Sequence, residues 1–183
     1  MRKLGKLILF LLIVVGIMAV LSTAMNDSWR VQRSIEVNAS PASVFSVIAK
    51  PSTWPTWTVW NTRENPNLEF KYDGASEGRG AKSFFKDGES SGSMVIGECI
   101  PPGRNNTATM AYTFTMDGFP PSHGRFTLNR PVKRTEVIWE LEGKHEGSFV
   151  EKAVSKWMMI IMKQQIGKDF DASLKGLKEK VDG

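Results

Sequence analysis

Cysteine and histidine are both scarce in this sequence of 183 residues. Cys99 is the only cysteine, which excludes an intrachain disulfide and a cysteine-based metal site. Because its neighbours are apolar, we expect Cys99 to be a small buried side chain rather than a reactive thiol. His123 and His145 lie in the hydrophilic stretches PSHGRF and GKHEGS, where solvated turn residues are expected. Neither His-x-x-x-His nor His-Glu-x-x-His occurs, so no metal site is predicted.

Basic residues are not concentrated outside the N-terminus. The net charge is +5, but removing Arg2, Lys3 and Lys6 from the 24 basic residues leaves 21 against 19 acidic ones. Lys and Arg alternate with Asp and Glu in the remainder, so no block could neutralise a run of phosphates. We therefore expect no nucleic-acid partner.

Functional motifs of phosphate binding and nucleophilic catalysis are also missing. The glycine-rich segment 74–80 lacks the Gly-Lys-Ser/Thr of a phosphate loop. The letters of Gly-x-Ser-x-Gly occur at 88–92 (GESSG), but at a hairpin-turn signal between expected strands and not at the strand-to-helix elbow that the motif requires. No nucleophile, base and orienting acid can be assembled from the remaining residues. The sequence thus predicts no catalytic residues and no cofactor.

One long uncharged run is present, from Leu7 to Met25. As a helix it would be about 28 Å long, close to the roughly 30 Å hydrocarbon core of a bilayer. Basic residues precede the run and Asp27 follows it, so the positive-inside rule places the N-terminus in the cytoplasm. We predict a cytoplasmic flank (1–6), a transmembrane helix (7–25) and an outward-facing domain (26–183).

Cleavage of this run as a signal peptide is the alternative. Ser22 and Ala24 are small residues at the −3 and −1 positions of a possible cleavage site. The strongly apolar part, Leu7–Leu21, is at the long limit of the apolar h-region of a signal peptide, about 15 residues, which favours a retained anchor. Cleavage near Ala24 would instead release the domain as a secreted or periplasmic protein.

The first part of the domain predicts a strand followed by short helices. Residues 29–37 alternate in the manner of a half-buried strand, with Arg33 as a charged interruption. Ser40-Pro41 is typical of a helix N-cap and first helical position. The segment PSTWPTWTVW that follows spaces its tryptophans by three, so they share one face.

The remainder predicts about six or seven antiparallel strands and one long helix. The clearest strand is 106–116, where apolar residues alternate with threonines. Residues 149–181 contain no proline and have apolar residues every three or four positions, which indicates an amphipathic helix with Gly167 as the expected weak point. An apolar sheet face must be covered, and this helix is the only element long enough. We therefore predict an α+β domain whose sheet curls around the final helix.

The sequence resembles the START-like helix-grip superfamily (SRPBCC), in particular its polyketide cyclase/dehydrase-like group. The likeness is carried by RSIEVNASPASVFSVIAKPSTWPTWTVWN, TEVIWEL and IGKDFDASLKGLKE and extends over nearly everything after Ser28. It implies a seven-stranded antiparallel sheet gripping the C-terminal helix, with two short helices after the first strand. It also implies an interior tunnel for a hydrophobic or amphipathic ligand.

Several residues are candidates for lining this cavity, and packing of the core is the competing explanation for each. Tyr72 and Tyr112, the only tyrosines, are the best candidates for a polar handle, and a hydrogen-bonded core tyrosine is the preferred interpretation. The candidates are Trp54, Trp57, Trp60, Tyr72, Met110, Tyr112, Phe114, Trp139, Trp157 and Ile161.

Three functions remain open at this point. The preferred one is binding or transport of a lipid-like small molecule by a membrane-tethered domain. The others are a cyclase-like enzyme acting on a hydrophobic substrate and a non-catalytic module of envelope assembly whose cavity is vestigial.

Overall fold

The computed structural model describes residues 2–130 and 133–183, so Met1 of the predicted cytoplasmic flank lies outside the described residues. The elements follow in the order predicted from the sequence. They are α1 (Arg2–Thr23), β1 (Ser28–Val37), α2 (Pro41–Ile48), the 3-10 helix η1 (Pro51–Thr56), β2 (Leu68–Gly74), β3 (Ala81–Asp87), β4 (Ser90–Ile100), β5 (Ala108–Met116), β6 (Phe119–Asn129), β7 (Thr135–Lys144) and α3 (Phe149–Asp182).

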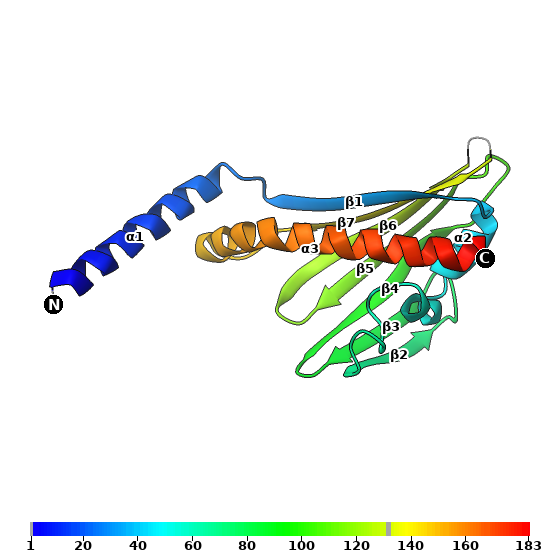
Figure 1. The fold of residues 1–183 in the computed structure, drawn as a ribbon, viewed down its shortest axis with the longest axis horizontal. Helices are drawn as coiled ribbons and strands as arrows, with labels where there is room; N and C mark the ends of the chain where they lie inside the picture. Colours follow the sequence, from blue (N-terminus) through cyan, green and yellow to red (C-terminus); the bar gives the residue numbers. More distant parts are fainter. Residues whose placement is uncertain (1, 131–132) are drawn as a thin grey trace.

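The strands form one seven-stranded antiparallel sheet in the order β1-β7-β6-β5-β4-β3-β2. The sheet curls, and α3 runs along β1 across its concave side, while α1 extends away from the rest of the chain (Figure 1). This α+β helix-grip fold confirms the fold predicted from the sequence. The apolar helix α1 is long enough to be a candidate membrane span, with a mean hydropathy of 2.8.

The helices α2 and α3 both begin with a serine whose side chain caps the helix. The hydroxyl of Ser40 accepts a hydrogen bond from the backbone N–H of Ser43, and Pro41 is the first residue of α2. Ser148 and Glu151 form a reciprocal capping box at the start of α3. These caps satisfy backbone N–H groups that have no partner within the helix.

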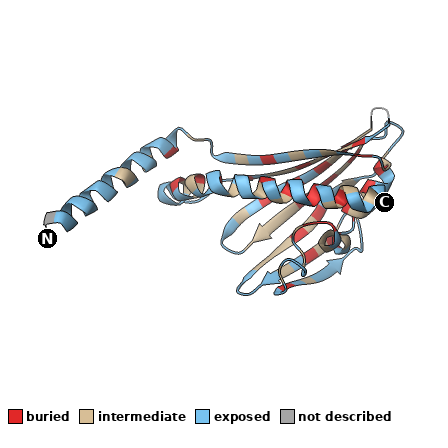
Figure 2. Cartoon of the chain, in the orientation of Figure 1, coloured by how far each residue is buried: buried red, intermediate tan, exposed pale blue. Residues whose placement is uncertain are grey.

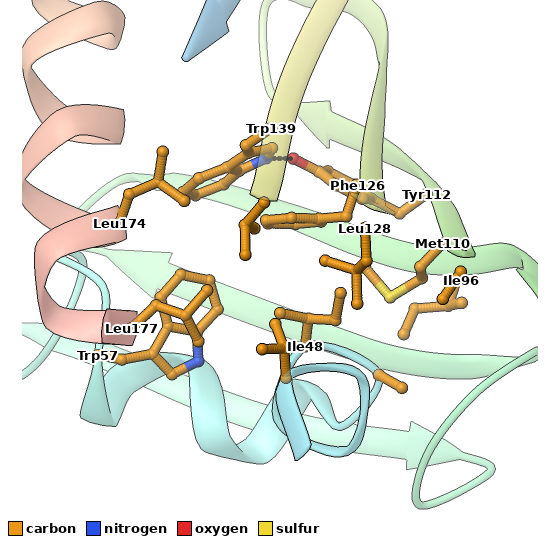
Figure 3. Close-up of a cluster of buried hydrophobic side chains, with 14 of the residues drawn as sticks. Ile48, Trp57, Ile96, Met110, Tyr112, Phe126, Leu128, Trp139, Leu174 and Leu177 are labelled. Atoms are coloured by element: carbon orange, nitrogen blue, oxygen red, sulfur yellow. Dashed lines mark hydrogen bonds between the residues drawn. The ribbon is translucent and has the colours of Figure 1, made fainter. Parts of the chain in front are cut away.

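The core lies between the concave side of the sheet and the C-terminal half of α3. Buried positions recur along the C-terminal half of α3 (Figure 2). Phe170, Leu174 and Leu177 are almost completely buried there. They meet the alternating residues of β5, β6 and β7 and the side chain of Ile48 from α2 (Figure 3). Burial on alternate positions is what a strand with one covered face requires.

Gly167 does not break α3, which continues as a helix of 34 residues. A Cβ atom at this position would collide with the guanidinium group of Arg33, so the glycine leaves room for that side chain. Nε of Arg33 lies 3.1 Å from Oδ2 of Asp171, one turn further along α3. The charged interruption in β1 is therefore explained by an ion pair with the helix above it.

Candidate functional site

Aromatic rings from the sheet, α3 and the segment around η1 meet on the concave side. We call this group the aromatic centre. Trp139 stacks on Phe170 at a ring distance of 3.9 Å and on Phe126 at 4.8 Å. Its members are Trp54, Trp57, Trp60, Tyr112, Phe126, Trp139 and Phe170.

The tryptophan segment covers this group from the side of η1. Trp54 meets Tyr112 edge to face at 5.4 Å and Trp60 meets Trp139 at 5.9 Å. Trp57 is buried, whereas Trp60 remains 40% exposed. Edge-to-face packing of this kind contributes about 0.5–1.5 kcal/mol per pair beyond burial of area. The three tryptophans therefore close the core, with Trp57 buried, Trp54 half-buried and Trp60 the most exposed of the three.

A hydrogen bond joins two strands at the middle of the aromatic centre. Nε1 of Trp139 donates to the hydroxyl oxygen of Tyr112 at 2.8 Å (Figure 3). A Cβ atom at Gly124 would overlap the Tyr112 ring, so this glycine makes room for it. Burial raises the pKa of Tyr112, which keeps its hydroxyl protonated. Tyr112 is thus a hydrogen-bonded core tyrosine.

The indole nitrogen of Trp57 is the buried side-chain polar atom that lacks a hydrogen-bond partner among residues 2–130 and 133–183. A donor left unpaired in a buried position costs about 1–3 kcal/mol. The aromatic centre thus contains one buried N–H donor, that of Trp57, without an acceptor among the described residues.

Burial of the concave face falls toward the end near α1. On β5, Met110 is fully buried, whereas Phe114 and Met116 on the same face are only half-buried. Phe114 stacks on Phe85 at 5.5 Å. We call this region the open end. Its half-buried residues are Trp29, Phe85, Phe114, Met116 and Leu141.

The remaining predicted site residues lie elsewhere. Tyr72 is 45% exposed and stacks on Phe70 at 6.4 Å near the outer edge of the sheet. Nε1 of Trp157 donates to the backbone oxygen of Met18 in α1 at 3.1 Å. Ile161 is 74% exposed. Trp157 and Ile161 lie in the first half of α3, which packs less deeply against the sheet, and they do not face Tyr112. It is Phe170, in the second half, that lies beside Trp139 in the core.

The structure also shows site residues that the sequence did not single out. Phe126 and Phe170 belong to the aromatic centre, and Trp29 and Phe85 to the open end. Strand alternation and helix period mark each of them as facing the core. Which of them meet depends on register and on the position of α3 along β1, and neither can be counted off the sequence.

Two of the surface hollows in the described part of the chain are well formed, and neither is lined by Trp57 or Trp139. One of about 130 Å³ lies on the outer face of the sheet among Glu98, Arg125 and Glu140. The other, of about 210 Å³, lies beside Tyr72 and Lys82. Sites for drug-sized ligands usually measure about 300–1,000 Å³. The aromatic side chains themselves occupy the interior where the resemblance places a tunnel.

No group of three or more His, Cys, Asp and Glu side chains suited to a metal ion occurs within the part of the chain that the structure describes. Cys99 is half-buried, and burial followed by the charge of Glu77 raises the pKa of its thiol. A raised pKa disfavours the reactive thiolate. Cys99 behaves as the small apolar side chain expected from its neighbours.

Comparison with known proteins supports the fold. The family described as polyketide cyclase / dehydrase and lipid transport matches residues 28–182. No curated protein sequence matches the chain.

Solved structures of low sequence identity share the same architecture. The Aha1 dimer of Colwellia psychrerythraea is similar with a TM-score of 0.57 and 14% identity, over 84% of this chain and 96% of that one. A protein of unknown function from Staphylococcus aureus gives 0.55 and 13%, over 86% and 99%. A START superfamily protein from Mycobacterium smegmatis gives 0.51 and 14%, over 83% and 96%. Likeness at these identities shows the fold alone.

Proposed function

Because the chain belongs to the polyketide cyclase / dehydrase and lipid transport family, we propose that it binds a hydrophobic or lipid-like small molecule at the open end while α1 anchors it in a membrane. In this proposal residues 1–6 are cytoplasmic, 7–25 span the bilayer and 26–183 form the ligand-binding domain on the outer side. The observation that carries it is the fall in burial along β5, from Met110 to Phe114 and Met116.

The open end has the chemistry of a site for apolar ligands. Its aromatic rings and methionine are apolar, and methionine adapts its shape to irregular partners. In the aromatic centre, Trp60 is 40% exposed and packs on Trp139 and Phe170, so movement of its ring would uncover these two side chains. A ligand that displaced this ring would bury apolar surface now partly in water, which favours binding by about 25 cal/mol per Å².

A retained anchor is supported by contacts between α1 and α3. Nζ of Lys156 donates to the backbone oxygens of Ser22 at 3.0 Å and Met25 at 2.9 Å. Lys156 is only 6% exposed. Cleavage after Ala24 would remove Ser22 and one of the acceptors of this buried ammonium group, which is costly when unpaired.

Photolabelling in liposomes tests both parts of the proposal. The full chain is reconstituted with a diazirine-bearing fatty acid, irradiated and digested, and the labelled peptides are identified by mass spectrometry. We expect label in α1 and in β5 around Phe114. Label in α1 alone would reject ligand binding at the open end, and no label in α1 would reject the anchor.

Two glutamate substitutions locate the ligand. Met116→Glu places a charge at the open end and should reduce labelling of β5 by about tenfold, because a charge next to apolar ligand is desolvated. Phe84→Glu is the matched control, since Phe84 is 41% exposed on the opposite face of β3. Equal labelling of β5 in both variants would contradict the assigned site.

A further inference from the structure

The first half of α3 carries an apolar stripe that is largely exposed among the residues that the structure describes. We call Val150, Val154, Trp157, Met158 and Ile161 the apolar stripe. They recur at i, i+4, i+7, i+8 and i+11, which places them on one face of a helix. Val150, Val154, Met158 and Ile161 are all exposed (Figure 2).

The same face of α3 becomes polar beyond the apolar stripe. Continuing the helical spacing from Ile161 brings Gln165, Lys168, Ala172, Lys175 and Glu179 to this face. All of them except Ala172 are polar or charged, and all are exposed. A helix face that only contacts water has no need of apolar residues in one half. The change from apolar to polar residues along this face of α3 therefore indicates that its two halves meet different surroundings.

The apolar half is the one that lies against α1. Trp157 donates to the backbone oxygen of Met18, which lies five residues before the end of α1 at Thr23. At 1.5 Å per residue, this contact is about 7–8 Å inside the end of α1. If α1 spans a bilayer, Trp157 is therefore at the depth where tryptophan is enriched, the boundary between hydrocarbon and headgroups.

The two helices are held together by buried polar contacts as well. Lys156 bonds to backbone oxygens of Ser22 and Met25 and lies 2.6 Å from the carboxylate of Asp27. These contacts fix the depth of α3 relative to α1. The start of α3 lies close to the end of α1 (Figure 1). The apolar stripe consequently adjoins the apolar surface of α1 at the level where that helix would leave a membrane.

We infer that the apolar stripe docks into the lipid surface beside α1, as an interfacial helix segment does. This rests on the proposed anchoring by α1 but not on ligand binding at the open end. Docking would place Lys168, the first charged residue on that face, about 10 Å along the helix from Ile161, within reach of anionic headgroups. It would also turn the open end, which lies at the same end of the domain, toward the bilayer.

Quenching by spin-labelled lipids tests this inference on the full chain. In a Cys99→Ser background, Val154→Cys or Ile161→Cys carries a nitrobenzoxadiazole fluorophore, and the protein is reconstituted in liposomes of phosphatidylethanolamine and phosphatidylglycerol. A doxyl label just below the headgroups should remove most of the emission at both positions. Ala172→Cys, on the same face of α3, is the matched control and should keep its emission.

Val15→Cys in α1 reports insertion of the anchor independently. Quenching at Val15→Cys without quenching at residues 154 and 161 would overturn docking and leave the anchor intact. No quenching at Val15→Cys would overturn the anchor and docking together. A blue-shifted emission at 161 that lipid spin labels do not quench would show that protein, such as a second copy, covers the stripe, and would also overturn the inference.

Discussion

Nζ of Lys156 lies 2.6 Å from Oδ1 of Asp27, and this pair joins α3 to the segment that follows α1. Hydrogen bonding to Lys156, followed by the charge of Lys152, holds the pKa of Asp27 below its usual value. The backbone N–H of His145 donates to the backbone oxygen of Asp27 at 2.8 Å. Nδ1 of His145 lies 2.7 Å from Oγ of Ser155. We call Ser22, Met25, Asp27, His145, Ser155 and Lys156 the junction.

Removing the cation should loosen the junction. Lys156→Met removes the hydrogen bonds from Nζ to the backbone oxygens of Ser22 and Met25, a loss of about 1–3 kcal/mol. Hydrogen exchange of the His145 amide should therefore become about 5- to 150-fold faster. Lys152→Met is the control, because Lys152 contacts the exposed Asp27 only at 3.5 Å, and such pairs contribute at most about 1 kcal/mol. Equal acceleration in both variants would contradict the role of Lys156.

The junction also predicts a pH dependence of stability. Burial, followed by the charge of Lys156, lowers the pKa of His145 below 6.5. The unfolded state therefore binds a proton before the folded state does as the pH falls. The free energy of unfolding should be constant above pH 6.5 and decrease below it, by at most about 1.4 kcal/mol per pH unit.

Chemical denaturation of the full chain in detergent micelles between pH 7.5 and 5 measures this dependence. His145→Gln should flatten the decrease, since the glutamine amide is uncharged and can still bond to Ser155. His123→Gln is the matched control, because His123 is exposed on β6, and it should leave the decrease unchanged. A decrease that survives in His145→Gln would assign the titration to another group.

The prediction that His145 is a solvated turn residue is wrong, and the reason is long-range. Its neighbours in GKHEGS are hydrophilic, yet the ring is 5% exposed, since α3 begins next to it and brings Ser155 onto its nitrogen. The burial of Lys156 is equally long-range, because its acceptors lie 134 residues away in α1 (Ser22) and 131 residues away just after α1 (Met25). Helical periodicity shows which face of α3 is apolar. It does not show which lysine of α3 will be buried against another helix.

Local periodicity was sufficient for most of the fold. The alternation on β5 correctly placed Met110 and Tyr112 on the covered face, because a strand has only two faces. Arg33 and Gly167 were each conspicuous in the sequence, one as a charge in an apolar pattern and one as a glycine in a helix. That they meet depends on how far α3 is shifted along β1, which is a tertiary property.

The contact between Arg33 and Gly167 can be tested by adding a methyl group. Ala is favoured over Gly in a helix by about 1 kcal/mol, but at position 167 its Cβ collides with the guanidinium. Gly167→Ala should therefore be neutral or destabilising alone, and stabilising by up to about 1 kcal/mol when Arg33→Ala is also present. Thermal or urea unfolding of the original chain, the two single variants and the double variant measures the change in the free energy of unfolding for this double-mutant cycle.

Gly176→Ala is the matched control for this cycle. A Cβ at Gly176 would collide with the backbone oxygen of Trp57, which cannot swing away as a side chain can. This substitution should destabilise the protein with either residue at position 33. If Gly167→Ala were stabilising while Arg33 is present, the close approach of the two residues would be refuted.

The last prediction concerns the hydrogen bond within the aromatic centre. Tyr112→Phe removes the acceptor but leaves Nε1 of Trp139 buried, which should cost about 1–3 kcal/mol in the free energy of unfolding. Tyr72→Phe is the control, because Tyr72 is exposed and a surface change of this kind usually stays within about 0.5 kcal/mol. Since the Tyr112 hydroxyl faces Trp139 rather than the open end, photolabelling of β5 should be unchanged in Tyr112→Phe. Full stability combined with lost labelling would instead assign the hydroxyl to the ligand, and the core role of Tyr112 would have to be abandoned.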